Sequence, residues 1–361
     1  MEIFEINKNI LFENYNYLSN KINCDKLFYA MKANGNDLVI KSLSDFGAGF
    51  EISSEGELQK VINCNVSPDN IISSIPVKTV NFIKNAYNYG VRYFVFDCLE
   101  ELQRLITYAP DAKKIMRVYI QDVDSESYVW GIKYDEFLKI KENNSALFNM
   151  IDGISIHISR NYQIRLLDKI FDRLECFVKE FNQNKKIIVN IGGGYFCKLP
   201  PYLEYKYNLD NYYIELNKKL DLLRDKFSLE IYCEPGRGIV DSACNLILPI
   251  QLLNVRNGKN IVFVNLNAYQ IGTLPIKIER IRNGETKLIF DADWVLDRKV
   301  KREKIVYSLV DTLCEWNELM KITSCEELQS MDVLKLYGVG AYSVTLSSDF
   351  HSRGRIKSVV I

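Results

Sequence analysis

A lysine at the end of an apolar run is the first residue whose position suggests chemistry. The run at 26–31 has the composition of a β-strand, Lys32 follows it, and Ala33-Asn34-Gly35-Asn36 is typical of a turn. A strand that ends in one cation holds an amine at the edge of a rigid scaffold. Once desolvated, such an amine can bond covalently to an aldehyde cofactor such as pyridoxal phosphate. Lysines at strand ends are also common on protein surfaces, so Lys32 alone leaves both interpretations open.

Other strand-like runs also end in residues that can do chemistry. These are Glu51, His157, the triplet Gly192-Gly193-Gly194 and the segment Glu234-Pro235-Gly236-Arg237. In a barrel of parallel strands the carboxyl ends all lie on one face, so these groups would converge there with Lys32.

Each of these groups suits one part of pyridoxal phosphate. Three glycines let backbone N–H groups close on a phosphate, and Arg237 can add a charge-assisted contact. A carboxylate at Glu234 can keep the pyridine nitrogen protonated, which makes the ring a better electron sink for loss of CO₂. His157 can stack on the ring. The ordinary alternatives are a tight turn for the glycines, a surface position for Arg237 and a core position for His157.

The runs that deliver these residues recur with helical stretches between them. Eight short apolar or alternating runs lie at 26–31, 49–52, 70–75, 91–96, 115–120, 153–158, 187–191 and 230–233. Stretches with helical apolar spacing separate most of them, for example Ser54–Val61, Val77–Tyr89 and Arg165–Phe181. Eight strands that alternate with helices predict an α/β fold, a (β/α)₈ barrel of the TIM type.

The pattern changes after about residue 240. Strand-like runs at 246–255, 260–266, 287–291, 304–310 and 332–337 follow one another with little helix, and Asn257-Gly258 and Asn283-Gly284 are turn signals. We predict a cofactor-binding barrel over residues 7–240 and a mainly β C-terminal domain over 241–361. The N-terminal strand, residues 1–6, is expected to pair with the first barrel strand or to join the β domain. The charged stretches Lys277–Arg282 and Arg298–Lys304 are interpreted as solvated faces.

Composition narrows the classes of function that are open to the chain. The 361 residues include 46 Lys+Arg and 46 Asp+Glu, and this zero net charge gives no basic footprint for nucleic acid or an anionic membrane. The acidic start does not resemble a signal peptide, and no apolar run reaches the length of a membrane span. Nine scattered cysteines favour reduced thiols in the cytoplasm. With only two histidines, His157 and His351, a His-rich metal site is excluded.

Taken together, the motifs resemble the pyridoxal-phosphate-dependent decarboxylases of the ornithine/arginine/diaminopimelate group, whose barrel is of the alanine-racemase type. The matching segments run in the family's order through nearly the whole chain: Tyr29–Asn34, Gly47–Leu58, Gly153–His157, Gly192–Gly194, Glu234–Arg237, Cys314-Glu315 and Gly340–Tyr342. The segment from Ser67 to Lys78 is most similar to the ornithine branch.

The resemblance implies a role for each matching residue. It implies that Lys32 holds pyridoxal 5′-phosphate covalently, that His157 stacks on its ring and that Glu234 faces its pyridine nitrogen. Further cofactor contacts are implied for Glu51, Gly193, Gly194, Gly236, Arg237 and Tyr342. Family members are head-to-tail homodimers with shared active sites, so Cys314 and Glu315 are expected to act in the other subunit's site. Cys314 would return a proton to Cα after CO₂ leaves.

Three positions depart from the family pattern. Glu51 replaces an aspartate of the ornithine branch, and Arg160 replaces a serine that usually contacts the phosphate or cofactor. Arg160 is expected to bind phosphate or a substrate carboxylate, unless it points to solvent. Leu274 stands where diaminopimelate enzymes have an arginine, which disfavours a substrate with a distal carboxylate. Glu279 and Glu315 are candidate acids for a distal substrate ammonium.

The sequence therefore predicts an amino-acid decarboxylase, a lyase that acts on a basic amino acid such as ornithine in polyamine synthesis. A modified amino acid or conjugate in siderophore or other natural-product synthesis is the alternative substrate. A non-catalytic, inhibitor-like relative that heterodimerises is the alternative of another class, and the presence of Lys32, Glu234 and Cys314 argues against it. No metal, nucleic acid or membrane is expected as a partner.

Overall fold

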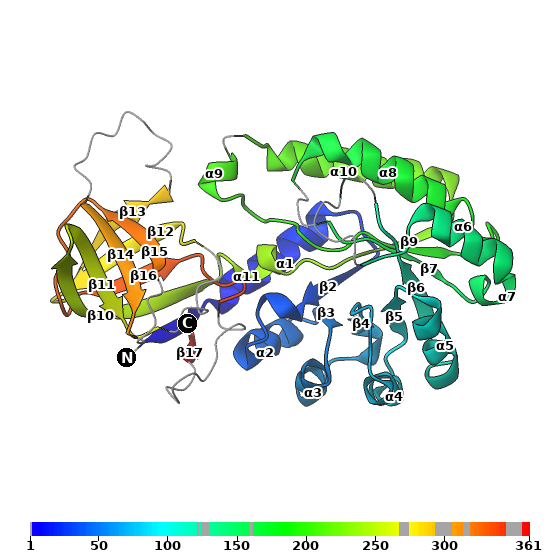
Figure 1. Ribbon diagram of the computed structural model, residues 1–361, viewed down its shortest axis with the longest axis horizontal. Coiled ribbons are helices and arrows are strands. Elements are labelled where there is room, and N and C mark those ends of the chain that lie inside the picture. The colour runs from blue at the N-terminus through cyan, green and yellow to red at the C-terminus, as the bar shows by residue number, and fades with distance from the viewer. Residues whose placement is uncertain are drawn as a thin grey trace.

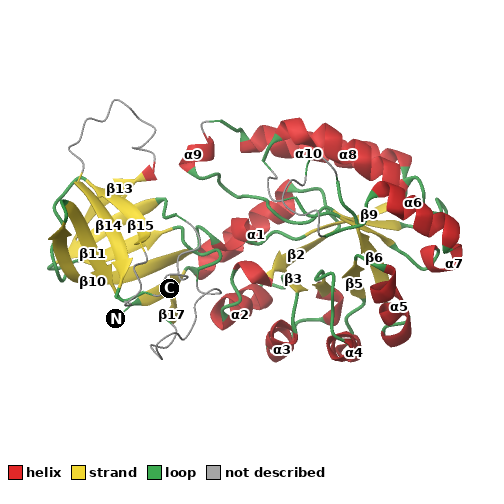
Figure 2. Cartoon of the chain, in the orientation of Figure 1, coloured by secondary structure: helices red, strands yellow, loops and turns green. Residues whose placement is uncertain are grey.

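The computed structural model describes most of the chain (Figure 1). The described residues are 2–120, 123, 130–158, 162–204, 206–266, 274–292, 305–312, 318–343 and 356–361. They form a helix-wrapped barrel beside a β-sheet region. Figure 2 shows that the helices gather around the barrel, whereas the second region consists mostly of strands.

Eight parallel strands close the barrel. In chain order they are β2 (Lys26–Ala30), β3 (Gly49–Ile52), β4 (Ile71–Ser73), β5 (Tyr93–Phe96), β6 (Lys113–Arg117), β7 (Gly153–Ser155), β8 (Ile187–Asn190) and β9 (Leu229–Cys233). Strand β9 pairs with β2 through Lys26–Tyr232 and Leu27–Cys233, which closes the ring. Each strand lies within or overlaps a run expected from the sequence, so the predicted (β/α)₈ barrel is confirmed.

Helices cover the outside of the barrel (Figure 1). They are α1 (Lys8–Lys21), α2 (Asp37–Asp45), α3 (Glu55–Asn63), α4 (Val80–Tyr89), α5 (Leu99–Tyr108), α6 (Tyr134–Asn143), α7 (Ser145–Phe148), α8 (Ile164–Val178), α9 (Pro201–Glu204), α10 (Leu209–Lys226) and α11 (Arg237–Val240). Short 3₁₀ turns occur at η1 (Met31–Ala33) and η2 (Pro68–Asn70). Side-chain caps set several helix starts: Ser54 accepts from the Glu57 N–H at α3, and Thr79 accepts from the Phe82 N–H at α4.

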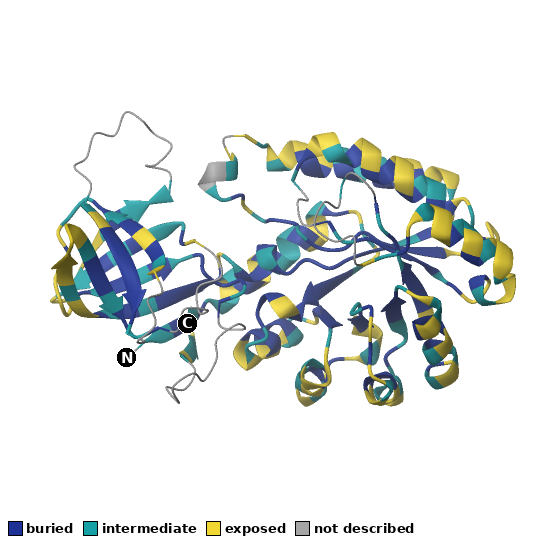
Figure 3. Ribbon diagram, viewed as in Figure 1, coloured by how far each residue is buried: buried dark blue, intermediate teal, exposed yellow. Residues whose placement is uncertain are grey.

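The barrel strands are mostly apolar on both faces because both faces are covered, and Figure 3 shows them largely buried. One set of side chains fills the barrel interior: Phe28, Ile72, Val95, Ile115, Ile188 and Tyr232. The alternate side chains join the larger core under the helices, for example Phe50, Phe94 and Ile231. This rigid packing holds the strand ends in place.

A nine-stranded sheet follows the barrel in the chain. Its strands are β1 (Ile3–Ile6), β10 (Cys244–Arg256), β11 (Lys259–Val264), β12 (Lys277–Arg282), β13 (Glu285–Asp291), β14 (Ile305–Asp311), β15 (Glu318–Ser324), β16 (Val333–Tyr337) and β17 (Lys357–Val360). The main path runs β13-β12-β16-β10-β11-β14-β15, and β1 pairs with both β10 and β17. The predicted mainly β region is therefore confirmed, and the N-terminal strand joins it rather than the barrel.

The interpretation of Lys277–Arg282 as a solvated face is wrong. This segment is strand β12, which pairs with β13 and β16. Its alternate residues Ile278 and Arg280 are buried, and Arg280 can be buried because Glu326 pairs with it at 3.0 Å. The second charged stretch, 298–304, lies outside the described residues.

Two Asn-Gly pairs form the tight turns that the sequence predicts. Asn257 and Gly258 join β10 to β11 with φ of 50° and 72°, and Asn283 and Gly284 join β12 to β13 with φ of 52° and 82°. Positive φ at both positions matches the right-handed twist of hairpin strands, and Asn and Gly tolerate it best.

The change of architecture falls between α11 and β10. We keep the division into residues 7–240 and 241–361 as a proposal, since β1 crosses it to join the later sheet. All eight cysteines that the structure describes are free thiols. None of the helices within the described ranges combines the length and hydropathy that crossing a bilayer requires.

Candidate active site

The carboxyl ends of the barrel strands carry the residues that the sequence singles out. Lys32 lies in η1 directly after β2, Glu51 is on β3, His157 follows β7, the glycine triplet follows β8 and Glu234 follows β9. Several of them lie close enough to interact electrostatically. Lys32 lowers the pKa of both Glu51 and His157, and Glu234 raises that of Glu51. The fold therefore brings the predicted amine, acids and imidazole to one mouth.

The backbone around Lys32 is held while its side chain is exposed. Met31 and Ala33 on either side are fully buried, which anchors η1. The Asn34 amide donates to the Gly340 carbonyl at 2.9 Å, and the Tyr342 N–H donates to the Ala33 carbonyl at 2.7 Å. These contacts join the lysine segment to the chain that follows β16, so both regions help to position the amine.

Glu234 is a buried carboxylate with neutral hydrogen-bond donors. Asn190, at the end of β8, donates from Nδ2 to Glu234 Oε1 at 2.6 Å. The Ser74 hydroxyl, just after β4, donates to the same oxygen. The Glu234 N–H in turn donates to the Gly192 carbonyl at 2.7 Å. Two donors hold the carboxyl group in one orientation.

Glu51 is the second buried carboxylate at the mouth. Its side chain is 3% exposed and accepts a hydrogen bond from the Ser53 hydroxyl at 2.8 Å. The pKa of Glu51 is raised to about 7, chiefly by burial and then by the nearby Glu234, while Lys32 opposes both effects. Glu51 is therefore poised to carry or release a proton near neutral pH.

His157 is neutral at physiological pH in this setting. Burial lowers its pKa to about 3, and the cations Lys32 and Arg117 add to that effect. A neutral imidazole suits a stacking contact with an aromatic ring, because it presents a flat face without an added charge.

The glycine triplet needs glycine for both conformation and space. Gly192 and Gly194 have φ of 68° and 87°, values that favour glycine. A Cβ on Gly193 would lie only 2.5 Å from the Glu234 carbonyl oxygen. The loop therefore packs closely on the segment after β9, and its glycines place no side chain of their own between the backbone and a phosphate.

The segment after β9 is equally tight. A Cβ on Gly236 would lie 2.8 Å from the Ala33 Cβ atom, so this glycine lets the segment pack on η1. The next residue, the half-buried Arg237, has its guanidinium carbon 5.1 Å from the ring centroid of Tyr342. Tyr342 has a φ of 58°. The two residues predicted to hold a phosphate thus touch each other.

The remaining predicted residues fall elsewhere. Glu279 is on β12, where it pairs with Lys277 at 2.6 Å and accepts from the Tyr337 hydroxyl at 2.6 Å. No contact recorded for it in the described part of the chain joins it to the lysine mouth. Arg160, Cys314 and Glu315 lie outside the described residues.

Two residues of the site were not expected from the sequence, Asn190 and Ser74. Asn190 had a readable signal, because it is a polar residue at the end of the otherwise apolar strand β8, directly before the glycine loop. Ser74 had none, since its contact with Glu234 joins positions 160 residues apart.

The donor set at the mouth fits pyridoxal phosphate. An amine for the aldehyde, a carboxylate for the pyridine nitrogen, a neutral imidazole for the ring face and a glycine loop for the phosphate all lie at the same end of the barrel. The glycine loop is the clearest test, because a side chain at Gly193 would collide with the chain that carries Glu234. The residues that would hold the cofactor are thus all present in one chain.

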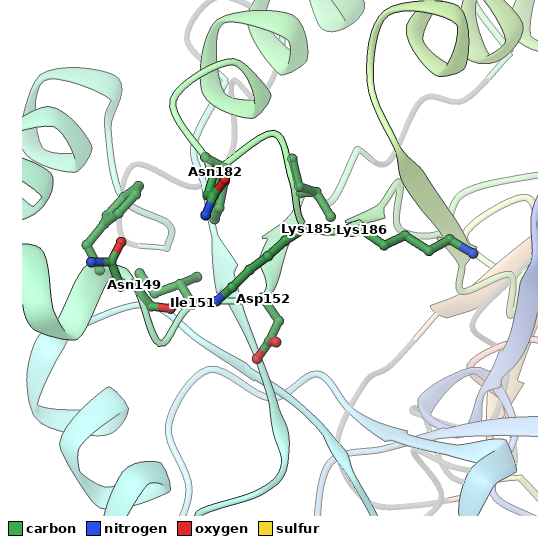
Figure 4. Close-up of a pocket in the computed structure, with 9 residues that line it drawn as sticks. Asn149, Ile151, Asp152, Asn182, Lys185 and Lys186 are labelled. Carbon is green, nitrogen blue, oxygen red and sulfur yellow. Dashed lines mark hydrogen bonds between the residues drawn. The ribbon is translucent and has the colours of Figure 1, made fainter.

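A cavity of about 290 Å³ lies at the opposite end of the barrel, before β7 and β8 (Figure 4). Asp152 there pairs with Lys113 at 3.0 Å, and Lys185 donates to the Asn149 carbonyl at 3.1 Å. Figure 4 shows Lys186 extending away from these residues. Because barrel enzymes carry their chemistry at the carboxyl ends of the strands, this cavity does not compete with the lysine mouth.

Comparisons with known proteins agree with this assignment. The family described as "Pyridoxal-dependent decarboxylase, pyridoxal binding domain" matches residues 11–241. A diaminopimelate decarboxylase of Haemophilus influenzae is 24% identical over 355 residues, covering 92% of this chain and 81% of that protein. An ornithine decarboxylase of Schizosaccharomyces pombe is 27% identical over 229 residues, covering 62% of this chain and 51% of that protein.

The fold likeness extends over the whole chain. The crystal structure of the Paramecium bursaria Chlorella virus arginine decarboxylase bound to agmatine has a TM-score of 0.83 at 21% identity. It covers 100% of this chain and 97% of the viral one.

A barrel with this mouth, followed by a β domain, defines a class of enzymes that use pyridoxal 5′-phosphate. The chain belongs to the family of pyridoxal-dependent decarboxylases, and it is a pyridoxal-phosphate-dependent amino-acid decarboxylase.

Proposed function

We propose that this decarboxylase acts on a basic amino acid, with ornithine as the first candidate, and that its product enters polyamine synthesis. The observation that carries the proposal is the convergence of the Lys32 amine with two buried carboxylates, Glu234 and Glu51. Decarboxylases of diaminopimelate, ornithine and arginine are among its relatives and structural neighbours, which supports a basic amino acid as substrate.

The proposed mechanism assigns one task to each residue of the mouth. When bound, the cofactor would supply an electron sink for the pair left on Cα as CO₂ departs. Lys32 would hold its aldehyde group. Glu234 would hold a proton on the pyridine nitrogen, and His157 would pack its neutral ring against the cofactor. The phosphate would be held by Gly193, Gly194, Gly236, Arg237 and Tyr342.

The proton that returns to Cα is assigned to a second subunit. We propose a homodimer in which Cys314 and Glu315 complete the other subunit's site. Cys314 would donate the proton, and Glu315 would bind the distal ammonium of the substrate. Glu279 would have to give up Lys277 and Tyr337 to take the latter task, so Glu315 is the better candidate. Arg160 is proposed to contact the phosphate or the substrate carboxylate.

A substrate panel tests the proposal directly. Purified protein with pyridoxal phosphate is assayed for CO₂ release from ornithine, lysine, arginine, diaminopimelate and carboxylated polyamine conjugates. The highest kcat/KM is expected for ornithine. A preference for diaminopimelate or arginine would overturn the ornithine assignment, and turnover of conjugates alone would favour natural-product synthesis. No turnover of any of them would contradict both assignments.

The shared site has its own test. Subunits with Lys32→Ala and subunits with Cys314→Ala are each expected to be inactive. Mixing them should restore partial activity, because one site of each mixed dimer then has both residues. Mixing Lys32→Ala with Glu234→Ala is the matched control, because both residues belong to the same half of the site and no intact site forms. Equal behaviour of the two mixtures would contradict sharing.

A further inference from the structure

Within the described residues, the hydrogen bonds to the Glu234 carboxylate end on one of its two oxygens. Both of its side-chain hydrogen bonds, from Asn190 and from Ser74, end on Oε1, and neither uses Oε2. The side chain is 8% exposed, so these two donors replace much of the hydration that the charge has lost. Such an arrangement orients the second oxygen for another partner.

The orientation of the Asn190 amide is determined by its own neighbours. Asn190 is fully buried, and its Oδ1 accepts the Gly192 N–H at 2.9 Å. Since Oδ1 serves the glycine loop, Nδ2 must face Glu234. The Glu234 N–H closes the circuit by donating to the Gly192 carbonyl at 2.7 Å. Asn190 thus links the loop that would hold the phosphate to the acid that would meet the ring nitrogen.

A second buried acid lies near Glu234. The charge on Glu234 raises the pKa of Glu51 on β3, and it also raises that of the Cys233 thiol on β9. Beside these groups, the hydrogen bonds from Asn190 and Ser74 hold the Glu234 carboxylate in one orientation.

We infer that Asn190 and Ser74 are positioning residues that hold Glu234 Oε1 and so leave its Oε2 to meet the ring nitrogen of a bound cofactor. This inference rests on the proposed role of Glu234. Both residues contact Glu234 rather than the substrate. Their loss should therefore lower the affinity for the cofactor more than it lowers the stability of the fold.

The test measures the affinity of the cofactor-free protein for pyridoxal phosphate. Ser74→Ala should raise the dissociation constant about tenfold, which is the usual effect of losing one hydrogen bond to a charged group. Asn190→Leu should raise it at least as much, because it also removes the acceptor of the Gly192 N–H. Ser73→Ala is the matched control: Ser73 is the neighbouring buried serine, and its hydroxyl has no partner within the described structure. The control should bind the cofactor as the parent protein does.

An analogue separates positioning from a general structural effect. In the analogue the ring nitrogen of pyridoxal phosphate is replaced by a carbon–hydrogen group, so Glu234 has no nitrogen to meet. The loss of affinity in Ser74→Ala should then largely disappear. An equal loss with the analogue would overturn the inference, because it would mean that the substitution disturbs the pocket as a whole.

The outcomes distinguish the inference from the proposed function. Parent protein that does not bind pyridoxal phosphate through Lys32 would contradict the proposed function itself. Parent protein that binds it, together with Ser74→Ala and Asn190→Leu proteins of unchanged affinity, would overturn only the inference. Ser74→Ala removes one hydroxyl at a half-buried position, so it decides the test even if Asn190→Leu does not fold.

Discussion

Two of the carboxylates buried near the carboxyl ends of the barrel strands have contrasting partners: Glu101 in the first turn of α5 and Glu234 after β9. Glu101 lies 3.1 Å from the Lys78 amine, which is itself fully buried, and 3.6 Å from Arg104. Glu234 has neutral donors, Asn190 and Ser74. Glu101 is thus neutralised by cations of its own chain, whereas the described hydrogen-bond partners of the Glu234 side chain are uncharged.

The surroundings of the Lys78 amine confirm the difference. It donates to the Ile75 carbonyl at 2.7 Å and also to the Val95 carbonyl, and the Lys78 N–H donates to Glu101 at 3.0 Å. Burial lowers the pKa of Lys78 to about 8, although Glu101 opposes that effect. These contacts tie the loop after β4 to β5 and α5. A buried ion pair whose partners all belong to the chain stabilises one conformation. A buried carboxylate that has only neutral donors, such as Glu234, can still bind a charged group of a ligand.

The largest effect is expected from breaking the buried pair. Lys78→Met should lower the free energy of unfolding by about 3–5 kcal/mol, because Glu101 would lose its buried partner. Urea unfolding of the variant measures this. The double variant Lys78→Met/Glu101→Leu should recover most of the loss, since it removes the stranded charge. A double variant as unstable as the single one would show that shape, not charge, is the cause.

Glu234 should behave in the opposite way. Glu234→Ala is expected to lower kcat by roughly 10²-fold or more, because the ring nitrogen loses its proton partner. Its unfolding free energy should fall much less than that of Lys78→Met, since its side-chain partners among the described residues, Asn190 and Ser74, are uncharged. Glu101→Gln is the matched comparison and should cost stability while the folded protein keeps its kcat. A near-normal kcat for Glu234→Ala would contradict its proposed role.

The barrel could be predicted because its strands are short apolar runs between helical stretches, and each strand has to be buried on both faces. Three strands of the later sheet were missed for different reasons. In β12 the charges of Arg280 and Arg282 are matched by Glu326 and Asp332 on other segments, which a single run of sequence does not reveal. Strands β15 and β17 are short or carry alternate polar residues, so they lack a strong pattern.

The site could be predicted where a residue stands at a strand end. Lys32, Glu51 and Glu234 have that signal, and the fold brings them together. Asn190 stands out as a polar residue at the end of β8, but its contact with Glu234 and that of Ser74 could not be predicted, because they join positions 44 and 160 residues apart in the chain. These contacts follow from closure of the barrel, which sequence spacing alone does not give.

Glu51, a third buried carboxylate, should make the stability of the fold depend on pH. Its pKa of about 7 in the folded protein lies above the value of an unfolded glutamate, so the folded state binds more protons and stability falls as pH rises toward 7. Glu51→Gln has no charge to bury. In cofactor-free protein the variant should therefore gain about 2–3 kcal/mol relative to the parent between pH 5 and pH 8. Thermal unfolding at both pH values measures the gain.

The control for that experiment is the exposed Glu55, which accepts a hydrogen bond from Asn85 at 2.7 Å. Glu55→Gln should follow the parent protein at both pH values. If Glu51→Gln also followed the parent, the carboxylate would not be the group whose ionisation is costly.

The smallest effect is expected from an ion pair that water can reach. Lys226 in the last turn of α10 lies 2.8 Å from Glu175 on α8, and these side chains are 52% and 39% exposed. Lys226→Met makes the same chemical change as Lys78→Met but should lower the unfolding free energy by only about 0.2–1 kcal/mol. Added salt should remove most of that difference, because salt screens exposed charges and affects a buried pair much less. A loss as large as that of Lys78→Met, unchanged by salt, would mean that burial does not separate the two pairs, and the contrast between Glu101 and Glu234 would then need another cause.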